Sequence, residues 1–154
     1  MNLHFVLNAK GGIGKSFISS LLCQYLLFKN ESILAIDTDP NNTTLYNIKA
    51  LKAKFLQLIS EDGNFNVREF DKIIEIAFDK KHDDIIIDSG ATTFIPLVSY
   101  LKENEIINLL KDNEINVYMH VPIVGGQARD DTILGLTQLI QAFDNSFVVW
   151  INEY

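Results

Sequence analysis

Seven residues near the N-terminus carry the strongest chemical signal in the sequence. They follow a short apolar run, open a stretch with helical spacing, and read Lys10-Gly11-Gly12-Ile13-Gly14-Lys15-Ser16. Glycines allow backbone conformations in which successive N–H groups point at one anion, and a helix N-terminus adds its positive dipole. A lysine ammonium and a serine hydroxyl at the end of such a loop suit phosphate oxygens and Mg²⁺. The segment therefore predicts a phosphate-binding loop.

The residues of this loop have distinct expected roles. We expect Lys15 to bind the β- and γ-phosphates of a nucleotide, and Ser16 to ligate Mg²⁺. The pattern departs from G-x-x-x-x-G-K-[ST] at its first position, Ala9, and adds a second lysine, Lys10. The alternative is a glycine-rich turn that only packs a helix against a strand. The remaining contacts to the nucleotide are expected from Gly11, Gly12, Ile13, Gly14 and Phe17.

Two further acidic sites suit the same chemistry. Asp37 and Asp39 follow the apolar run that ends at Ile36, and Asp88 ends the run that begins at Asp84. Ligands of open α/β sheets bind beyond the carboxyl ends of the strands, where an aspartate can hold Mg²⁺ directly or through water. A lone aspartate at a strand end is an ordinary loop cap as well. Together with the loop, these aspartates predict a metal–nucleotide site.

The elements that must position these residues follow from periodicity. Five runs have the length and composition of strands, at 3–7, 32–36, 84–88, 115–124 and 147–151. Helical spacing covers 15–29, 67–78, 96–110 in two pieces, and 129–143, and we expect a helix at the start of the ambiguous stretch 43–58. Strands alternating with helices predict an α/β fold, a mostly parallel twisted sheet with helices on both faces. We expect these three layers to form a single domain over 1–154.

Composition excludes several classes of protein. The 154 residues are 47% hydrophobic and 21% charged, with a formal net charge of −7, which is typical of a globular chain and unsuited to non-specific binding of nucleic acid or anionic membranes. A single cysteine forms no internal disulfide and no cysteine-rich metal site, which favours the cytoplasm. The three histidines lack metal-ligand spacing, and we interpret His120 as structural. No run of about 18 apolar residues predicts a membrane span.

The motifs resemble those of a known superfamily. KGGIGKS at 10–16 is similar to the deviant Walker A motif of the ParA/MinD ATPases, and IDTDP at 36–40 is similar to their second motif. Within that superfamily the chain resembles the TraL family of plasmid conjugal transfer proteins. The resemblance covers essentially the whole chain. It is carried by KGGIGKSFI at 10–18, IDTDPNN at 36–42, DDIIIDSGATTFIPLVSYL at 83–101, GGQARDDTILGLTQL at 125–139 and FVVWIN at 147–152.

The resemblance implies a P-loop NTPase that binds ATP with Mg²⁺ and forms a nucleotide-dependent homodimer. In that scheme Lys10 reaches the partner's nucleotide, Asp39 positions or deprotonates the attacking water, and Asp88 is the Walker B acid. Asp37 supports Mg²⁺ through water, and Asn152 reads the adenine edge. Lys10 as a solvated loop lysine and Asn152 as a strand-end turn residue remain open alternatives.

Three functions compete at this stage. The first is a slow Mg-dependent ATPase that acts as a switch in plasmid conjugal transfer or DNA mobilisation. The second is a nucleotide-binding scaffold with little or no hydrolysis that recruits a transfer or partition protein. The third is a structural fragment independent of nucleotide. TraL-like proteins continue past the position of Tyr154, so this chain is expected to lack their C-terminal part, which motivates the second hypothesis. Membrane attachment and direct DNA binding are not expected.

Overall fold

The computed structural model describes residues 1–60 and 62–153, and over these residues the chain forms one six-stranded sheet. The strand order is β3-β2-β4-β1-β5-β6, and every pair of neighbouring strands is parallel. The phosphate-loop strand β1 therefore lies inside the sheet, between β4 and β5. The strands are β1 (Asn2–Val6), β2 (Ile33–Asp37), β3 (Lys54–Phe55), β4 (Asp84–Asp88), β5 (Asn116–Val124) and β6 (Ser146–Asn152).

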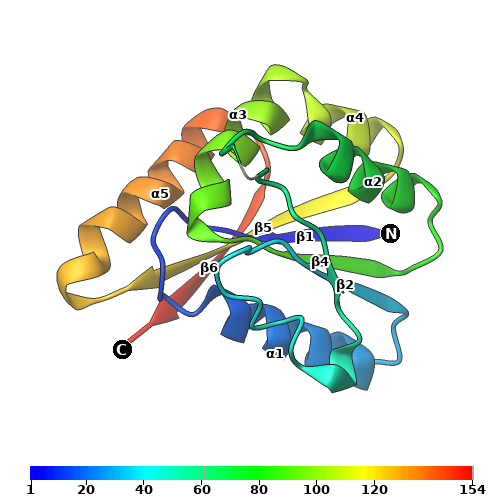
Figure 1. The fold of residues 1–154 in the computed structure, drawn as a ribbon, viewed down its shortest axis with the longest axis horizontal. Coiled ribbons are helices and arrows are strands. Elements are labelled where there is room, and N and C mark those ends of the chain that lie inside the picture. The colour runs from blue at the N-terminus through cyan, green and yellow to red at the C-terminus, as the bar shows by residue number, and fades with distance from the viewer. Residues whose placement is uncertain (61, 154) are drawn as a thin grey trace.

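Helices cover both faces of the sheet, so the predicted three-layer α/β fold is confirmed (Figure 1). The helix α1 (Lys15–Phe28) lies on one face, and the other helices lie on the opposite face. Within the described residues, no helix is both long and apolar enough to cross a membrane. The helices of the second face are α2 (Val67–Phe78), α3 (Phe94–Glu103), α4 (Ile106–Asp112) and α5 (Arg129–Ala142).

Alternation along the strands divides the apolar side chains between the two faces. On β4, Ile85 and Ile87 belong to the larger core cluster, which includes side chains of α2, α3, α4 and α5. Ile86 points the other way and packs with Ile18 and Cys23 of α1 in a smaller cluster. A strand covered on both faces reads as a continuous apolar run, which is why these strands are visible in the sequence.

The helix expected at the start of 43–58 is absent, and that prediction is wrong. The segment forms turns, the short 3₁₀ helix η1 (Lys49–Leu51) and the strand β3, which pairs with β2. Leu45 and Leu51 are buried with the side chains on the α1 side of the sheet, so the apolar residues of this segment serve to pack a loop and not a helix. The carboxylate of Asp37 also accepts a hydrogen bond from the N–H of Tyr46 at 2.9 Å, which holds the loop in this conformation.

The stretch predicted as two helical pieces at 96–110 does divide, into α3 and α4. Glu105 sits between them with a φ of 50°, a left-handed conformation that no α-helix continues through. Pro96 is the third residue of α3, where its missing N–H costs no intrahelical bond.

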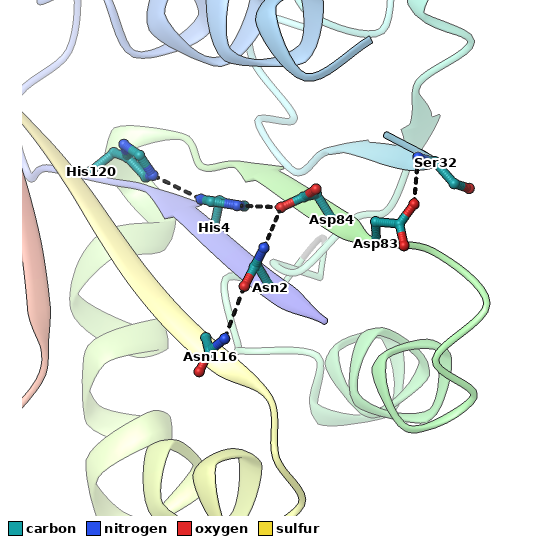
Figure 2. Close-up of polar contacts among 7 residues, drawn as sticks. All are labelled: Asn2, His4, Ser32, Asp83, Asp84, Asn116 and His120. Atoms are coloured by element: carbon teal, nitrogen blue, oxygen red, sulfur yellow. Dashed lines mark hydrogen bonds and ion pairs between the residues drawn. The ribbon is translucent and has the colours of Figure 1, made fainter. Parts of the chain in front are cut away.

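A chain of side-chain hydrogen bonds ties four neighbouring strands together. Trp150 Nε1 donates to His120 Nδ1 at 3.0 Å, and because an indole N–H only donates, His120 Nδ1 must accept. The neutral His120 ring then carries its proton on Nε2 and donates it to His4 Nδ1 at 2.9 Å. His4 donates from Nε2 to Asp84 Oδ1, also at 2.9 Å (Figure 2). One donor-only group thus fixes the tautomers of both histidines.

Two asparagines extend this network along the amino ends of the strands. Asn2 Nδ2 donates to Asp84 Oδ1 at 2.9 Å, and Asn116 Nδ2 donates to Asn2 Oδ1 at 3.0 Å (Figure 2). Burial lowers the pKa of His120 to about 4 and also lowers the pKa of His4, although Asp84 opposes the shift at His4. Both rings are therefore neutral near pH 7, as the network requires, and His120 has a structural role.

We predict that His120→Gln weakens the dependence of stability on pH in mild acid. The unfolded chain protonates this histidine near pH 6.5, whereas the folded chain does so only near pH 4. The contribution of His120 to the free energy of unfolding is therefore complete above pH 6.5 and is lost as pH falls toward 4. It amounts to about 1.4 kcal/mol for each unit by which the pKa differs between the two states. Urea unfolding at pH 7 and pH 4.5 measures the loss, which should be smaller in His120→Gln.

His82→Gln is the control, because His82 lies outside this network. The free energy of unfolding of this variant should depend on pH as that of the wild type does. Burial raises the pKa of Asp88 to about 6, which acts on stability in the opposite direction. That contribution cancels when His120→Gln is compared with the wild type. Equal losses of unfolding free energy in His120→Gln and in the wild type would contradict the assignment.

Candidate functional site

The loop between β1 and α1 has the backbone geometry of an anion site. Gly12 and Gly14 have φ values of 73° and 95°, in the left-handed region that favours glycine. Gly14 is the N-cap of α1, and among the described residues no side chain caps this end of the helix. The first turn of α1 also carries no acidic residue. The N-terminus of α1 is therefore open to a negatively charged ligand.

Lys15 places its ammonium inside this loop. The side chain is buried, and Nζ donates to the carbonyl oxygen of Lys10 at 2.7 Å. Burial lowers the pKa of Lys15, while the nearby carboxylates of Asp88 and Asp39 act to raise it. A cation held among backbone carbonyl and carboxylate groups in this way is suited to exchange one of them for a phosphate oxygen.

Asp88 lies behind Lys15 at the carboxyl end of β4. Its Oδ1 accepts a hydrogen bond from Ser19 at 3.0 Å, and its buried Oδ2 has no hydrogen-bond partner among the described residues. Burial raises the pKa of Asp88 to about 6, against the hydroxyls of Ser16 and Ser19 and the charge of Lys15. A buried carboxylate oxygen left without a donor, close to a serine hydroxyl, fits a divalent cation.

The described residues contain no cluster of three or more His, Cys, Asp or Glu that is arranged to hold a metal. Mg²⁺ is usually held by one or two carboxylates, waters and phosphate oxygens rather than by such a cluster. Ser16 and Asp88 are the predicted ligands whose hydroxyl and carboxylate lie close together here.

Asp37 shapes the wall of the site. Its Oδ1 accepts from the N–H of Asp39 at 3.0 Å and its Oδ2 accepts from the N–H of Tyr46 at 2.9 Å. The side chain is fully buried, and burial raises the pKa of this carboxyl despite those two bonds. The geometry thus gives Asp37 a second task beside the predicted support of Mg²⁺, since it organises the loop that carries Asp39.

Asp39 reaches the cleft from this loop and lies against the segment after β4. Its Oδ1 accepts from the N–H of Asn41 at 2.9 Å. A Cβ added to Gly90 would lie only 2.8 Å from Asp39 Cγ and 3.2 Å from Asp39 Cα. A glycine is therefore required at position 90 for the two loops to approach this closely.

A cleft of about 400 Å³ lies at the carboxyl edge of the sheet. Its lining brings together seven of the predicted residues: Gly11, Gly12, Gly14, Lys15, Ser16, Phe17 and Asp39. Asp37 and Asp88, predicted to hold Mg²⁺, are buried and do not line it. Ile13 instead points into the protein and is buried. Four other lining residues have no role predicted from the sequence, although the first three lie only two to five positions after Asp39. They are Asn41, Asn42, Thr44 and Ala91. Thr92 also lines the cleft, and its hydroxyl, like that of Ser89, is a candidate from the sequence to contact the γ-phosphate.

Two predicted residues lie at the margin of the cleft. Lys10 directs Nζ away toward α5, where it pairs with Asp131 Oδ2 at 2.8 Å. Asn152 ends β6 beside the loop, and its Nδ2 donates to the carbonyl oxygen of Ile13 at 3.4 Å. The same nitrogen lies 3.4 Å from the position of a Cβ on Gly14. Lys10 thus belongs to the loop and Asn152 lies next to it, but neither residue lines the cleft.

The parallel sheet and the glycine-rich loop that joins its central strand to a helix define a P-loop NTPase fold. A family model described as "CobQ/CobB/MinD/ParA nucleotide binding domain" matches residues 4–152. The chain belongs to this family. Two proteins from Escherichia coli, both called "Protein TraL", are 41% identical to it over 154 residues, which is 99% of this chain. The chain spans 63% of the length of these relatives.

Solved structures support the fold at much lower identity. A plasmid partition protein from Borrelia burgdorferi superposes with a TM-score of 0.54 at 14% identity, over 97% of this chain and 76% of that one. The cell division protein MinD from Aquifex aeolicus gives 0.55 at 16% identity, over 100% and 70%. Chloroplast FtsY from Physcomitrella patens gives 0.61 at 11% identity, over 96% and 48%.

We predict that Gly90→Ala destabilises the protein and displaces Asp39. The new methyl group would meet Asp39 backbone and side-chain atoms, and such overpacking costs roughly 1–3 kcal/mol. Gly125→Ala is the matched control, since a Cβ there meets nothing within 4 Å and the φ of Gly125 is −80°. Thermal denaturation of both variants measures the difference, and equal melting temperatures would contradict the close approach.

Proposed function

We propose that this protein is a Mg-dependent ATP-binding switch that hydrolyses ATP slowly. The single observation that carries the proposal is the cleft itself. It is lined at one edge of the sheet by the uncapped N-terminus of α1, the buried ammonium of Lys15 and the carboxylate of Asp39, and the buried carboxylate of Asp88 lies behind Lys15. This combination of an anion site with acidic residues behind it is suited to a phosphate chain that carries a metal ion.

Phosphate binding would use the loop as it stands. The N–H groups of the loop and of the first turn of α1 would bind phosphate oxygens, and Lys15 Nζ would exchange the carbonyl oxygen of Lys10 for one of them. The hydroxyl of Ser16 and the unpaired Oδ2 of Asp88 would hold Mg²⁺, directly or through water. The metal ion would neutralise charge on the phosphates.

Hydrolysis would depend on Asp39 and Lys10. Asp39 lines the cleft and would orient a water molecule or accept its proton. Lys10, released from Asp131, would reach the nucleotide of a second copy and stabilise the charge that develops on the phosphates. Preference for ATP over GTP rests on the resemblance to ParA/MinD proteins, with Asn152 as the residue proposed to contact adenine.

The biological role proposed is plasmid conjugal transfer or DNA mobilisation, through a protein partner bound in one nucleotide state. The support is the similarity to proteins named TraL over nearly the whole of this chain. A nucleotide-binding scaffold with little hydrolysis is the second candidate. It is motivated by the Ser89-Gly90-Ala91 segment after β4. The resemblance implies a turn that contains proline at this place in ParA proteins, whereas TraL-like proteins share the small residues.

We predict that Mg-ATP stabilises the wild-type protein and fails to stabilise Lys15→Ala. A ligand at a hundred times its dissociation constant adds about 2.7 kcal/mol, which is roughly 5–10 °C in a domain of this size. Thermal-shift titrations with Mg-ATP and Mg-GTP measure the effect. Lys54→Ala is the control, because Lys54 is exposed on β3 and lies outside the cleft. A wild-type protein that responds to neither nucleotide would overturn the proposal.

We predict that Asp39→Asn abolishes phosphate release while Mg-ATP binding persists. Loss of a positioned base typically costs 10²–10⁴-fold in rate. Single-turnover release of phosphate separates the two candidate functions, with Asp112→Asn, on α4 away from the cleft, as the control. Undiminished release in Asp39→Asn would contradict the role of Asp39. A wild-type protein that binds ATP and releases no phosphate would favour the scaffold.

A further inference from the structure

Asn8 is a fully buried residue at the start of the phosphate loop, and both polar atoms of its side chain form hydrogen bonds. Its Nδ2 donates to the carbonyl oxygens of Pro122 at 3.0 Å and Thr132 at 3.1 Å. Its Oδ1 accepts from the N–H of Lys10 at 3.3 Å. The amide cannot be turned over, because that would place its oxygen against two carbonyl oxygens. One side chain thus joins the loop to both β5 and α5.

The need for such a side chain follows from the lengths of the strands. β1 pairs with β5 only from Asn116 to His120, and β5 continues to Val124. The carbonyl of Pro122 therefore lies beyond the end of β1 and has no backbone donor from that strand. Since a buried carbonyl without a donor is costly, Asn8 supplies from its side chain what β1 no longer supplies from its backbone.

α5 is built to accept Asn8. A Cβ added to Gly135 would lie 2.5 Å from Asn8 Oδ1 and 3.0 Å from Asn8 Cγ, so only glycine allows this approach. Glycine within a helix costs about 1 kcal/mol relative to alanine, which itself indicates a packing reason.

Thr132 adds further hydrogen bonds between β5 and α5. We call the contact region formed by Asn8, Thr132 and Gly135 the joint. Thr132 Oγ1 accepts from the N–H of Val124 at 3.3 Å and donates to the carbonyl of Arg129 at 2.9 Å. The side chain is fully buried. The first turns of α5, the end of β5 and the start of the loop therefore form one hydrogen-bonded unit.

We propose that Asn8, seated against Gly135, is a positioning residue for the nucleotide site. This inference rests on the proposed function. Asn8 Oδ1 accepts a hydrogen bond from the N–H of Lys10, and the carbonyl oxygen of Lys10 accepts one from the ammonium of Lys15 at 2.7 Å. The location of α5 thus fixes the peptide units on both sides of Lys10 and, through them, the cation that meets the phosphates. A displacement of α5 relative to the sheet is transmitted to the phosphate loop through this amide.

A double-mutant cycle tests the joint, with Asn8→Ala, Gly135→Ala and the two combined. We expect each single variant to weaken Mg-ATP binding at least tenfold in equilibrium titrations. The methyl group of Gly135→Ala conflicts chiefly with Asn8 side-chain atoms, so it should cost less than threefold once Asn8 is alanine. Melting temperatures of the same four proteins, measured without nucleotide, should show the same non-additivity.

Ile73→Val provides the control for a general loss of stability. Ile73 is fully buried in α2, away from the loop, so this variant should lower the melting temperature and leave the affinity for Mg-ATP unchanged. Asn8→Ser, which replaces the amide by a smaller hydroxyl donor, takes the place of Asn8→Ala in the cycle if the alanine variant does not fold, and the same result is expected.

Three outcomes would overturn the positioning role. Wild-type affinity in Asn8→Ala or Gly135→Ala is the first, and effects on affinity that simply add in the double variant are the second. In the third, Ile73→Val loses as much affinity as the Asn8 variant at a matched loss of stability. If the wild-type protein and Ile73→Val both fail to bind nucleotide, the proposed function fails and this role fails with it. Non-additive melting temperatures would then show only that the joint exists.

Discussion

The buried ammonium of Lys15 is the charge on which the rest of the cleft depends. Removing an ammonium from water is costly unless hydrogen bonds and opposite charges replace the water. The carbonyl of Lys10 and the carboxylates of Asp88 and Asp39 do so here. Burial disfavours both charged forms, because it lowers the pKa of Lys15 and raises that of Asp88. The attraction between the two charges opposes this effect and stabilises the ionised form of each. In the proposed function, a phosphate with its metal ion would enter a site already arranged for both.

The order of the strands makes this arrangement possible. In the register of the sheet Val6 lies opposite Asp88, which in turn lies opposite Asp37, so the ends of β1, β4 and β2 are level. Residues about 80 positions apart in the chain thus meet at one edge, as the rule for parallel α/β sheets requires. The polar network runs from His120, which pairs with Val6 at the carboxyl end of β1, through His4 to Asp84 at the amino end of β4, and it ties the same strands laterally.

The sequence predicts the parts of this site whose signals are local. The glycine-rich loop, the apolar strands that end in aspartate, and the alternation of strands and helices can all be recognised within short windows. The conformation of 43–58 could not be predicted, because it depends on two contacts outside a short window. The N–H of Tyr46 donates a hydrogen bond to Asp37, nine residues away, and Leu45 packs on the face of the sheet that α1 covers. The reasons for Gly90 and Gly135 were also hidden, because each glycine is required by a side chain from a distant segment.

The two lysines of the loop differ in a way that suits a switch. Lys15 is buried and bonded within its own loop, so its position is set before any ligand arrives, and preorganisation of this kind reduces the cost of binding. The side chain of Lys10 is 43% exposed, and its partner Asp131 is 57% exposed. Ion pairs this open to water contribute about 0–1 kcal/mol, so the side chain can leave at little cost. The Lys10 backbone nevertheless stays fixed through Asn8. In the proposed switch, this rigid backbone would let the fixed ammonium of Lys15 bind phosphate in its own cleft while the releasable ammonium of Lys10 reaches a second nucleotide.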